Sequence, residues 1–171
     1  MDLGCNAGGM LHAISGQIGK GYGFDFNPNC INAAQLIKTL NQTGNLEFYV
    51  FDLDKQSLSL LSAFLFGQRV DICFLLSVCM WIERWREVVR LAAKISDCML
   101  FESNGSVEQQ KSQVELLESL YQRMEVISES SKDDFSCNSR TLYFCSSPRT
   151  ANLQSGNVGE LPSCSQVMYS N

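Results

Sequence analysis

Short apolar runs alternate along the chain with longer segments in which apolar residues recur every three or four positions. The short runs span residues 20–26, 46–51, 70–76, 97–102, 124–129 and 140–146. Their length and their content of Val, Ile, Phe and Tyr predict β-strands. The longer segments span residues 8–18, 29–42, 58–66, 81–95 and 107–122. Spacings such as Ile31, Ala34 and Ile37 place apolar residues on one face, which predicts a helix in each segment.

The order of these elements predicts how the strands pair. Strands that are apolar throughout and separated by helices are typical of a parallel sheet covered on both faces. The last two runs are separated only by polar residues 130–139, without a helix. Two strands joined in this way pair antiparallel. We therefore predict a doubly wound α/β sheet that is mostly parallel, with an antiparallel last strand and helices on both faces.

Both ends of the chain depart from this alternation. Residues 148–171 have no apolar periodicity and are dominated by Ser, Asn, Gln, Gly and Pro, which predicts a disordered tail. At the other end a glycine-rich loop begins after three residues, although a doubly wound sheet needs a strand leading into such a loop. We therefore expect one domain over residues 1–147, N-terminally incomplete because its first strand, at residues 1–3, is largely missing.

The charge of the chain narrows the range of partners. The 171 residues include 13 Lys and Arg against 18 Asp and Glu, which gives a formal net charge of −5 at pH 7. An acidic chain gains little from a phosphate backbone, so we do not expect nucleic-acid binding driven by charge alone. The richest apolar stretch, residues 70–82, includes Asp71 and is too short to span a bilayer. No membrane partner is expected.

Eight cysteines are spread along the chain, and none forms a C-x-x-C pair. This excludes a zinc ribbon and a thioredoxin-like redox motif, and we assign no metal ligands. Cys73, Cys98 and Cys145 lie inside apolar runs, where a reduced cysteine behaves as a small hydrophobic residue. Such usage predicts a reducing, cytoplasmic compartment.

Candidate chemistry begins at the glycine loop, residues 4–9. It follows Asp2 and reads Gly4-Cys-Asn-Ala-Gly8-Gly9, so the pattern is Asp-x-Gly-x-x-x-Gly. A pyrophosphate site would instead show Gly-x-Gly-x-x-Gly. Glycines between a strand and a helix let the backbone approach a ligand, and the acidic residue before them suits a ligand that carries an ammonium group. A glycine-rich structural turn is the alternative interpretation.

Two further carboxylates follow the next strands. Asp25 ends one apolar run, about 20 residues after the first glycine of the loop, where a doubly wound sheet places its ribose-binding carboxylate. Asp52 follows the next run, where a carboxylate can accept the exocyclic amine of adenine while Phe51 or Leu53 packs on the ring. The alternative for Asp25 is an Asx turn leading into Pro28, and the alternative for Asp52 is a solvated loop.

Taken in order, these motifs resemble a known family. The glycine loop, Asp25, Asp52 and then Val70-Asp-Ile-Cys-Phe-Leu-Leu-Ser77-Val-Cys-Met-Trp81 are similar to the successive motifs of class I S-adenosylmethionine (SAM)-dependent methyltransferases. The resemblance covers residues 1–147. It implies a Rossmann-like fold with a seven-stranded sheet whose last strand is antiparallel, and SAM as the cofactor.

The resemblance also implies roles for individual residues. Asp2 and Gly4 would lie near the methionine moiety of SAM. Asp25 would bind the ribose, Asp52 would hold the adenine, and Ser77 would line the cofactor site or the substrate entrance. The cofactor-binding residues that we expect are Asp2, Gly4, Cys5, Asn6, Gly8, Asp25, Phe26, Asp52, Leu53 and Ser77.

Methyl transfer to an oxygen or an amine needs a base if the acceptor must lose a proton. Glu102 is the candidate catalytic residue because it ends the fifth strand, and open α/β sheets place their sites at the carboxyl ends of strands. Alternatively, Glu102 caps the turn before the next helix. No Asn-Pro-Pro-Tyr-like motif follows the fourth strand, so we expect the acceptor to be a small molecule or a modified RNA nucleoside.

Two other functions stay open on the sequence. A nicotinamide-dependent oxidoreductase would share the doubly wound sheet, but the missing Gly-x-Gly-x-x-Gly and the antiparallel closing pair disfavour it. A truncated, non-catalytic methyltransferase-like domain that binds a protein partner is the other alternative. The short first strand favours that second alternative.

Overall fold

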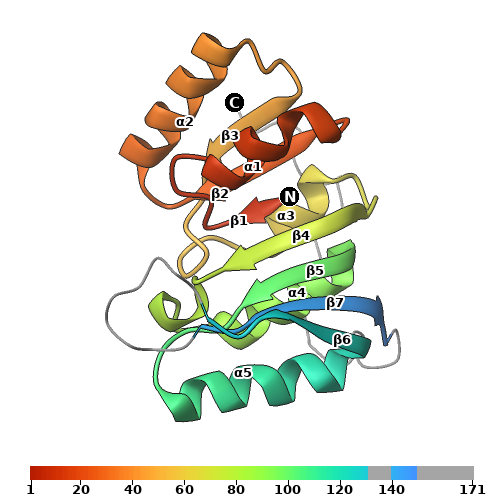
Figure 1. The fold of residues 1–171 in the computed structure, drawn as a ribbon. Helices are drawn as coiled ribbons and strands as arrows, with labels where there is room; N and C mark the ends of the chain where they lie inside the picture. The colour runs from red at the N-terminus through yellow and green to blue at the C-terminus, as the bar shows by residue number, and fades with distance from the viewer. Residues whose placement is uncertain (131–139, 150–171) are drawn as a thin grey trace, which may run out of the picture.

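A seven-stranded sheet forms the centre of the computed structural model, which describes residues 1–130 and 140–149 (Figure 1). The strands are β1 (Asp2–Leu3), β2 (Gly21–Asp25), β3 (Leu46–Val50), β4 (Val70–Leu76), β5 (Ser96–Glu102), β6 (Tyr121–Ser128) and β7 (Leu142–Pro148). Their order across the sheet is β3-β2-β1-β4-β5-β7-β6. β7 runs antiparallel to β5 and β6, while every other neighbouring pair is parallel. The predicted mostly parallel sheet with an antiparallel last strand is confirmed.

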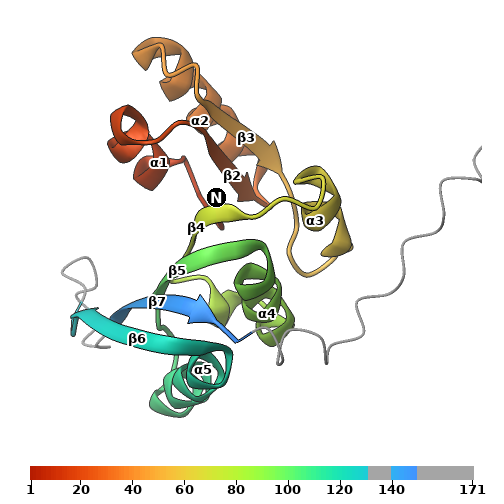
Figure 2. The same ribbon diagram turned by 90° about the vertical axis from the view of Figure 1, so that its right-hand side faces the viewer.

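Helices cover both faces of this sheet (Figure 2). They are α1 (Gly9–Ile14), α2 (Pro28–Asn41), α3 (Ser59–Phe64), α4 (Trp85–Ile95) and α5 (Val107–Leu120), with short 3-10 turns at Ser15–Gln17 and Cys79–Trp81. α1 and α2 lie on one face, and α3, α4 and α5 lie on the other. The result is the three-layer arrangement that the alternating sequence predicts.

The central strand β4 shows why the parallel strands are apolar throughout. Cys73 and Leu75 pack in one core cluster with residues of α3, α4 and α5. Phe74, between them in the sequence, packs in a second cluster with residues of α1 and α2. Successive side chains of a strand point to opposite faces, so a strand between two helix layers needs apolar residues at every position.

The first strand is short, as predicted, but it is paired on both sides. Asp2 is aligned with Gly23 of β2 and with Phe74 of β4, and Leu3 is aligned with Phe24. The N–H of Phe74 also donates to the Met1 carbonyl at 2.8 Å. Two residues are therefore sufficient to occupy the centre of the sheet and to lead into the glycine loop.

Several predicted boundaries need correction. The helix expected over residues 81–95 begins at Trp85, because Cys79–Trp81 forms a separate 3-10 turn. The helix expected over residues 107–122 ends at Leu120, and β6 starts directly at Tyr121. The apolar residues at these junctions fit both helical and strand periodicity, so the pattern alone places the boundaries poorly.

The domain also extends slightly further than its predicted end. β7 runs to Pro148, which we had assigned to the tail. Arg149 adds two hydrogen bonds: its N–H donates to the Leu120 carbonyl at 2.7 Å, and its Nε donates to the Tyr121 carbonyl at 3.0 Å. The polar connection 131–139 and residues 150–171, which include the rest of the predicted tail, lie outside the described residues.

Within the described ranges, no helix combines the length and the apolar character that crossing a membrane requires. The longest helices are α2 and α5, each of 14 residues, whereas a membrane-spanning helix needs about 20 apolar residues.

Candidate functional site

A cavity of about 650 Å³ opens at the carboxyl ends of β1, β2, β3 and β4. The chain order reverses at this point, because β1 is followed outward by β2 and β3 on one side and by β4 and β5 on the other. In doubly wound sheets the crevice at such a reversal is where ligands bind. The volume also lies within the range of about 300–1,000 Å³ that is typical of small-molecule sites.

The glycine loop forms the floor of the cavity where β1 ends. Gly4 has a φ of 83° and Gly8 a φ of 75°, which is the left-handed region that favours glycine. A Cβ on Gly4 would lie 2.6 Å from Cγ2 of Val78, and a Cβ on Gly8 would lie 2.5 Å from Cε1 of Phe48. The loop therefore needs these glycines both for its backbone conformation and for its close packing against the sheet.

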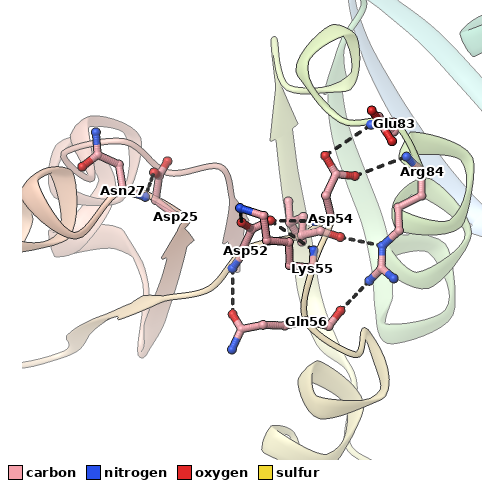
Figure 3. A network of polar contacts seen from close by, with 9 residues as sticks. Asp25, Asn27, Asp52, Asp54, Lys55, Gln56, Glu83 and Arg84 are labelled. Carbon is pink, nitrogen blue, oxygen red and sulfur yellow. Dashed lines mark hydrogen bonds and ion pairs between the residues drawn. The ribbon is translucent and has the colours of Figure 1, made fainter.

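Asp25, the last residue of β2, connects two loops of the site. Its Oδ2 accepts the N–H of Asn6 at 2.9 Å, and its Oδ1 accepts the N–H of Asn27 at 2.9 Å. Figure 3 shows the second of these contacts. The residue is only 8% exposed, but it lines the cavity. Each carboxylate oxygen has a second lone pair, so Asp25 can still accept two hydrogen bonds from a ligand.

Asp52 has fewer free acceptors than the sequence suggests. Its Oδ1 accepts the N–H groups of Asp54 at 3.0 Å and Lys55 at 3.2 Å, and its Oδ2 pairs with the Lys55 ammonium at 3.1 Å (Figure 3). Burial alone would raise the pKa of Asp52, but the hydrogen bonds from Lys55 and from these two backbone groups lower it below its usual value. Asp52 therefore shapes its own loop and stays ionised at the edge of the cavity.

Ser77 and Glu102 meet at the ends of β4 and β5. The Ser77 hydroxyl donates to Oε2 of Glu102, and Nη1 of Arg140 donates to the Ser77 hydroxyl at 3.0 Å. Ser77 has a φ of 55°, an unusual conformation for serine that is often found at functional sites. It lines the cavity, whereas Glu102 lies behind it.

Most of the predicted cofactor-binding residues lie together. Seven of the ten line the cavity: Gly4, Asn6, Asp25, Phe26, Asp52, Leu53 and Ser77. The other three, Asp2, Cys5 and Gly8, do not. Cys5 is buried in the core, where its Sγ faces Gly23, and Gly8 precedes the first residue of α1. The sequence pattern does not distinguish loop residues that line the cavity from those that pack against the sheet.

Asp2 lies in the sheet, where burial together with the nearby Asp25 carboxylate raises its pKa to about 7. Its ionisation at neutral pH is therefore incomplete, unlike that of an exposed aspartate. This places a titrating group directly before the glycine loop.

Sequence reasoning missed several lining residues. The polar ones are Asn27, Cys30, Asp54 and Lys55, and the apolar ones include Leu76, Val78 and Ile82. Trp81, which ends the last of the family-like motifs in the sequence, also lines the cavity and is 75% exposed. The signal that was available is position, because each of these residues lies at the carboxyl end of β2, β3 or β4 or in the segment just after it.

The charges around the cavity are mostly negative. Asp25, Asp52 and Asp54 line it, and Lys55 is the only Lys or Arg among its lining residues within the described chain. That lysine is already paired with Asp52. Such a lining favours a cationic ligand over one that carries a pyrophosphate. No cluster of three or more potential metal-binding side chains occurs in the described part of the chain.

Comparisons with known proteins identify the fold. No protein-family model and no curated protein sequence matches the chain. Among solved structures, the N-terminal domain of EvdMO1, crystallised in the presence of S-adenosylhomocysteine (SAH) and D-fucose, superposes with a TM-score of 0.67 at 14% identity. That match covers 86% of this chain and 75% of that domain.

Longer proteins contain the same fold as one part. A longer EvdMO1 chain matches with a TM-score of 0.68 at 15% identity, and the bifunctional kinase-methyltransferase WbdD matches with a TM-score of 0.66 at 20% identity. The chain spans 36% of the length of EvdMO1 and 34% of that of WbdD, while 85% of the chain is matched in each case. The fold is that of the class I SAM-dependent methyltransferases, as the sequence motifs predict.

Proposed function

We propose that this chain binds SAM in the cavity at the ends of β1–β4 and transfers its methyl group to a small molecule or a modified nucleoside. The observation that carries the proposal is the carboxylate-lined cavity at the reversal of strand order, with Asp25 at the end of β2. SAM carries a sulfonium and an ammonium group, so it suits a lining in which acidic residues outnumber basic ones. NAD, with its pyrophosphate, suits it poorly.

Each part of the cofactor has candidate contacts in this proposal. The glycine loop and Asn6 contact the methionine moiety, and Asp25 accepts hydrogen bonds from the ribose hydroxyls. Leu53 and Ile82, which line the cavity from different loops, pack on the adenine. Asp2 supports the glycine loop from beneath, because its carboxyl group is buried in the sheet. SAM supplies an electrophilic methyl group when it is bound.

Ser77 and Glu102 together remove the proton of the acceptor. An acceptor hydroxyl or amine gives its proton to the Ser77 oxygen as the Ser77 hydroxyl proton passes to the Glu102 carboxylate. With SAM bound, the acceptor oxygen or nitrogen would form its new bond to the methyl carbon, and breaking the bond from that carbon to sulfur would release SAH with a neutral thioether. The existing hydrogen bonds from Arg140 to Ser77 and from Ser77 to Glu102 support this route, because they orient the groups in advance.

Exposed aromatic residues favour a ring-bearing acceptor. Phe26 and Trp81 line the cavity and are 69% and 75% exposed, so they stand at its opening. Aromatic faces pack well on sugar rings and on nucleobases. Because the EvdMO1 domain was crystallised in the presence of D-fucose, we favour a hydroxyl group of a sugar or of a nucleoside as the acceptor.

Calorimetric titration with SAM, SAH and NAD tests the cofactor assignment. We expect micromolar binding of SAM and SAH and none of NAD. Binding of NAD alone would favour the oxidoreductase alternative. Absence of binding by all three would contradict the proposal and leave the protein-binding alternative.

A Glu102→Gln variant tests the proposed base. We expect the rate of methyl transfer from labelled SAM to fall by about 100-fold, the usual scale of general-base catalysis, while the Kd for SAH stays within twofold of wild type. The acceptor can be found by screening monosaccharides and nucleosides with labelled SAM. Glu118→Gln, an exposed position on α5, is the matched control. An unchanged rate in Glu102→Gln would remove Glu102 from the mechanism.

A further inference from the structure

Two segments that are far apart in the sequence form facing walls of the cavity. One follows β3 and includes Leu53 and Asp54; the other follows β4 and includes Trp81 and Ile82. β3 and β4 are not neighbours in the sheet, because β2 and β1 lie between them. The hydrogen bonds of the sheet therefore do not join these two walls directly. Their separation depends on contacts between the segments themselves.

Arg84, the residue before α4, makes the first set of such contacts. Its Nε donates to the Leu53 carbonyl at 2.7 Å, and its Nη2 donates to the Gln56 carbonyl at 2.5 Å (Figure 3). The planar guanidinium holds both carbonyls at once, which fixes the direction of the peptide groups as well as their distance. Arg84 does not line the cavity, so it acts on the site through Leu53.

Asp54 makes the second set of contacts, which run from the segment after β3 to the segment after β4. Its Oδ2 accepts the N–H of Glu83 at 3.3 Å, and its Oδ1 accepts the N–H of Arg84 at 3.3 Å (Figure 3). Arg84 is the N-cap residue of α4 and makes no side-chain cap bond of its own. The Asp54 carboxylate, which lies on the facing wall, therefore accepts hydrogen bonds from backbone N–H groups near the positive N-terminal end of α4.

We propose that Arg84 and Asp54 form a reciprocal clamp that sets the adenine end of the cofactor site. The proposal rests on SAM binding in this cavity. The clamp fixes the Leu53 peptide on one wall and the segment that carries Ile82 on the other, and these two side chains are those assigned to the faces of the adenine. Arg84 is a positioning residue, and Asp54 both lines the cavity and positions α4.

An Arg84→Ala variant tests the clamp. We expect the Kd for SAH to rise at least tenfold. The Kd for adenosine should rise by the same factor, because the variant disorders only the walls around the adenine, which both ligands carry. Arg84→Lys keeps the charge but not the planar fork, so it should recover less than half of the lost binding free energy. Combining Arg84→Ala with Asp54→Ala should weaken SAH binding by less than the product of the two single effects.

Arg69 offers a matched control at the opposite end of the sheet. Its guanidinium also binds two backbone carbonyls, those of Lys94 and Ser96, and it pairs with Asp97. Arg69→Ala should lower the melting temperature but leave the Kd for SAH within twofold of wild type. A merely structural role of Arg84 would give the same result as this control.

The outcomes separate the clamp from the proposed function. If the wild-type chain does not bind SAH, the proposed function fails. If wild type binds SAH and Arg84→Ala binds it equally well, the clamp is wrong while SAM binding stands. Should Arg84→Ala fail to fold, Asp54→Asn and Arg84→Lys give the test, and unchanged SAH affinity in both would overturn the clamp.

Discussion

Both carboxylate oxygens of Asp25 already hold backbone N–H groups, one from the glycine loop and one from the loop after β2. On the sequence alone, its turn-forming role and its ribose-binding role are alternatives. The geometry accommodates both, because a carboxylate has about four acceptor positions and the backbone uses two. Asp52 also arranges its own loop, but its ion pair with Lys55 leaves it fewer free acceptor positions. At the scale of the residue, the turn contacts of Asp25 leave room for the ligand contacts that we propose.

Asp25→Ala tests the role of this residue in binding. We expect the Kd for SAH to increase by about 10-fold to 150-fold, which corresponds to about 1.5–3 kcal/mol for hydrogen bonds to a charged group. Calorimetric titration measures the change, with Asp71→Ala as control because Asp71 is exposed near the other end of β4. An affinity equal to that of wild type would remove Asp25 from the site.

Asp2 leads to a prediction about pH. Burial raises its pKa in the folded protein to about 7 from an ordinary value of 3.8, so between these values the folded state binds a proton that the unfolded state has lost. The contribution of Asp2 to the free energy of unfolding is therefore present below about pH 4 and decreases as the pH rises to about 7.

Urea unfolding of wild type and Asp2→Asn at pH 5 and pH 8 measures this contribution. The variant cannot ionise at this position, so we expect its stability relative to wild type to be greater at pH 8 than at pH 5. An identical pH dependence in wild type and Asp2→Asn would contradict the assignment.

At the scale of the element, the sequence predicted the type and order of nearly every helix and strand, and it erred at junctions. β4 was predicted correctly at Val70–Leu76 because polar residues precede its apolar run and Ser77 interrupts the apolar stretch after it. The helix expected over residues 81–95 would put Trp81 and Trp85 on one face, but a break after the 3-10 turn separates them. The start of α4 also depends on Asp54, which lies in a different loop and accepts the N–H of Arg84. Local periodicity carries no information about such a contact.

The same reasoning explains which of the cavity-lining residues the sequence could predict. Residues of a distinctive type at or just after the end of a strand, such as Asp25, Asp52 and Ser77, were predicted and do line the cavity. Ile82 and Val78 also line it but were not predicted, because an apolar residue that lines a cavity looks like a core residue in the sequence. The facing direction of Cys5 and Gly8 depends on the path of the glycine loop, which a pattern of spacings does not specify.

Gly4→Ala tests the glycine loop as an element. Its φ of 83° costs an alanine about 1–2 kcal/mol, and its Cβ would lie 2.6 Å from Cγ2 of Val78, which adds an overpacking cost of about 1–3 kcal/mol. We expect a loss of about 2–5 kcal/mol in urea unfolding, with weaker SAH binding.

Two companion variants make the Gly4 test specific. Gly9→Ala, the first residue of α1, has open space around the added methyl group and should be neutral or slightly stabilising, since alanine is the better helix former. Combining Gly4→Ala with Val78→Ala should recover the part of the loss that is due to crowding. If Gly4→Ala is as stable as Gly9→Ala, the described path of the loop is wrong.

At the scale of the whole molecule, the cavity lies between the two halves of the doubly wound sheet and is lined by residues of both. Asp25 and Asp52 come from the half formed by β1, β2 and β3, whereas Ser77 and Trp81 come from the half that begins with β4. A ligand that contacts both halves stabilises their association, and it does so only in the folded state. Binding should therefore raise the stability of the entire domain through mass action.

The size of this effect follows from the linkage relation. At a free SAH concentration of 100 times Kd, the free energy of unfolding should rise by about 2.7 kcal/mol. For a domain of this size each kcal/mol shifts the melting temperature by about 2–4 °C, so we expect an increase of about 5–11 °C. NAD at the same concentration should give no shift, because acidic residues outnumber basic ones in the cavity lining and disfavour its pyrophosphate. Differential scanning fluorimetry over a series of SAH concentrations measures the shift, which should keep rising with the logarithm of concentration above Kd. A melting temperature that does not respond to saturating SAH, established by calorimetry in the same buffer, would mean that the ligand also binds the unfolded chain or contacts only one half of the sheet.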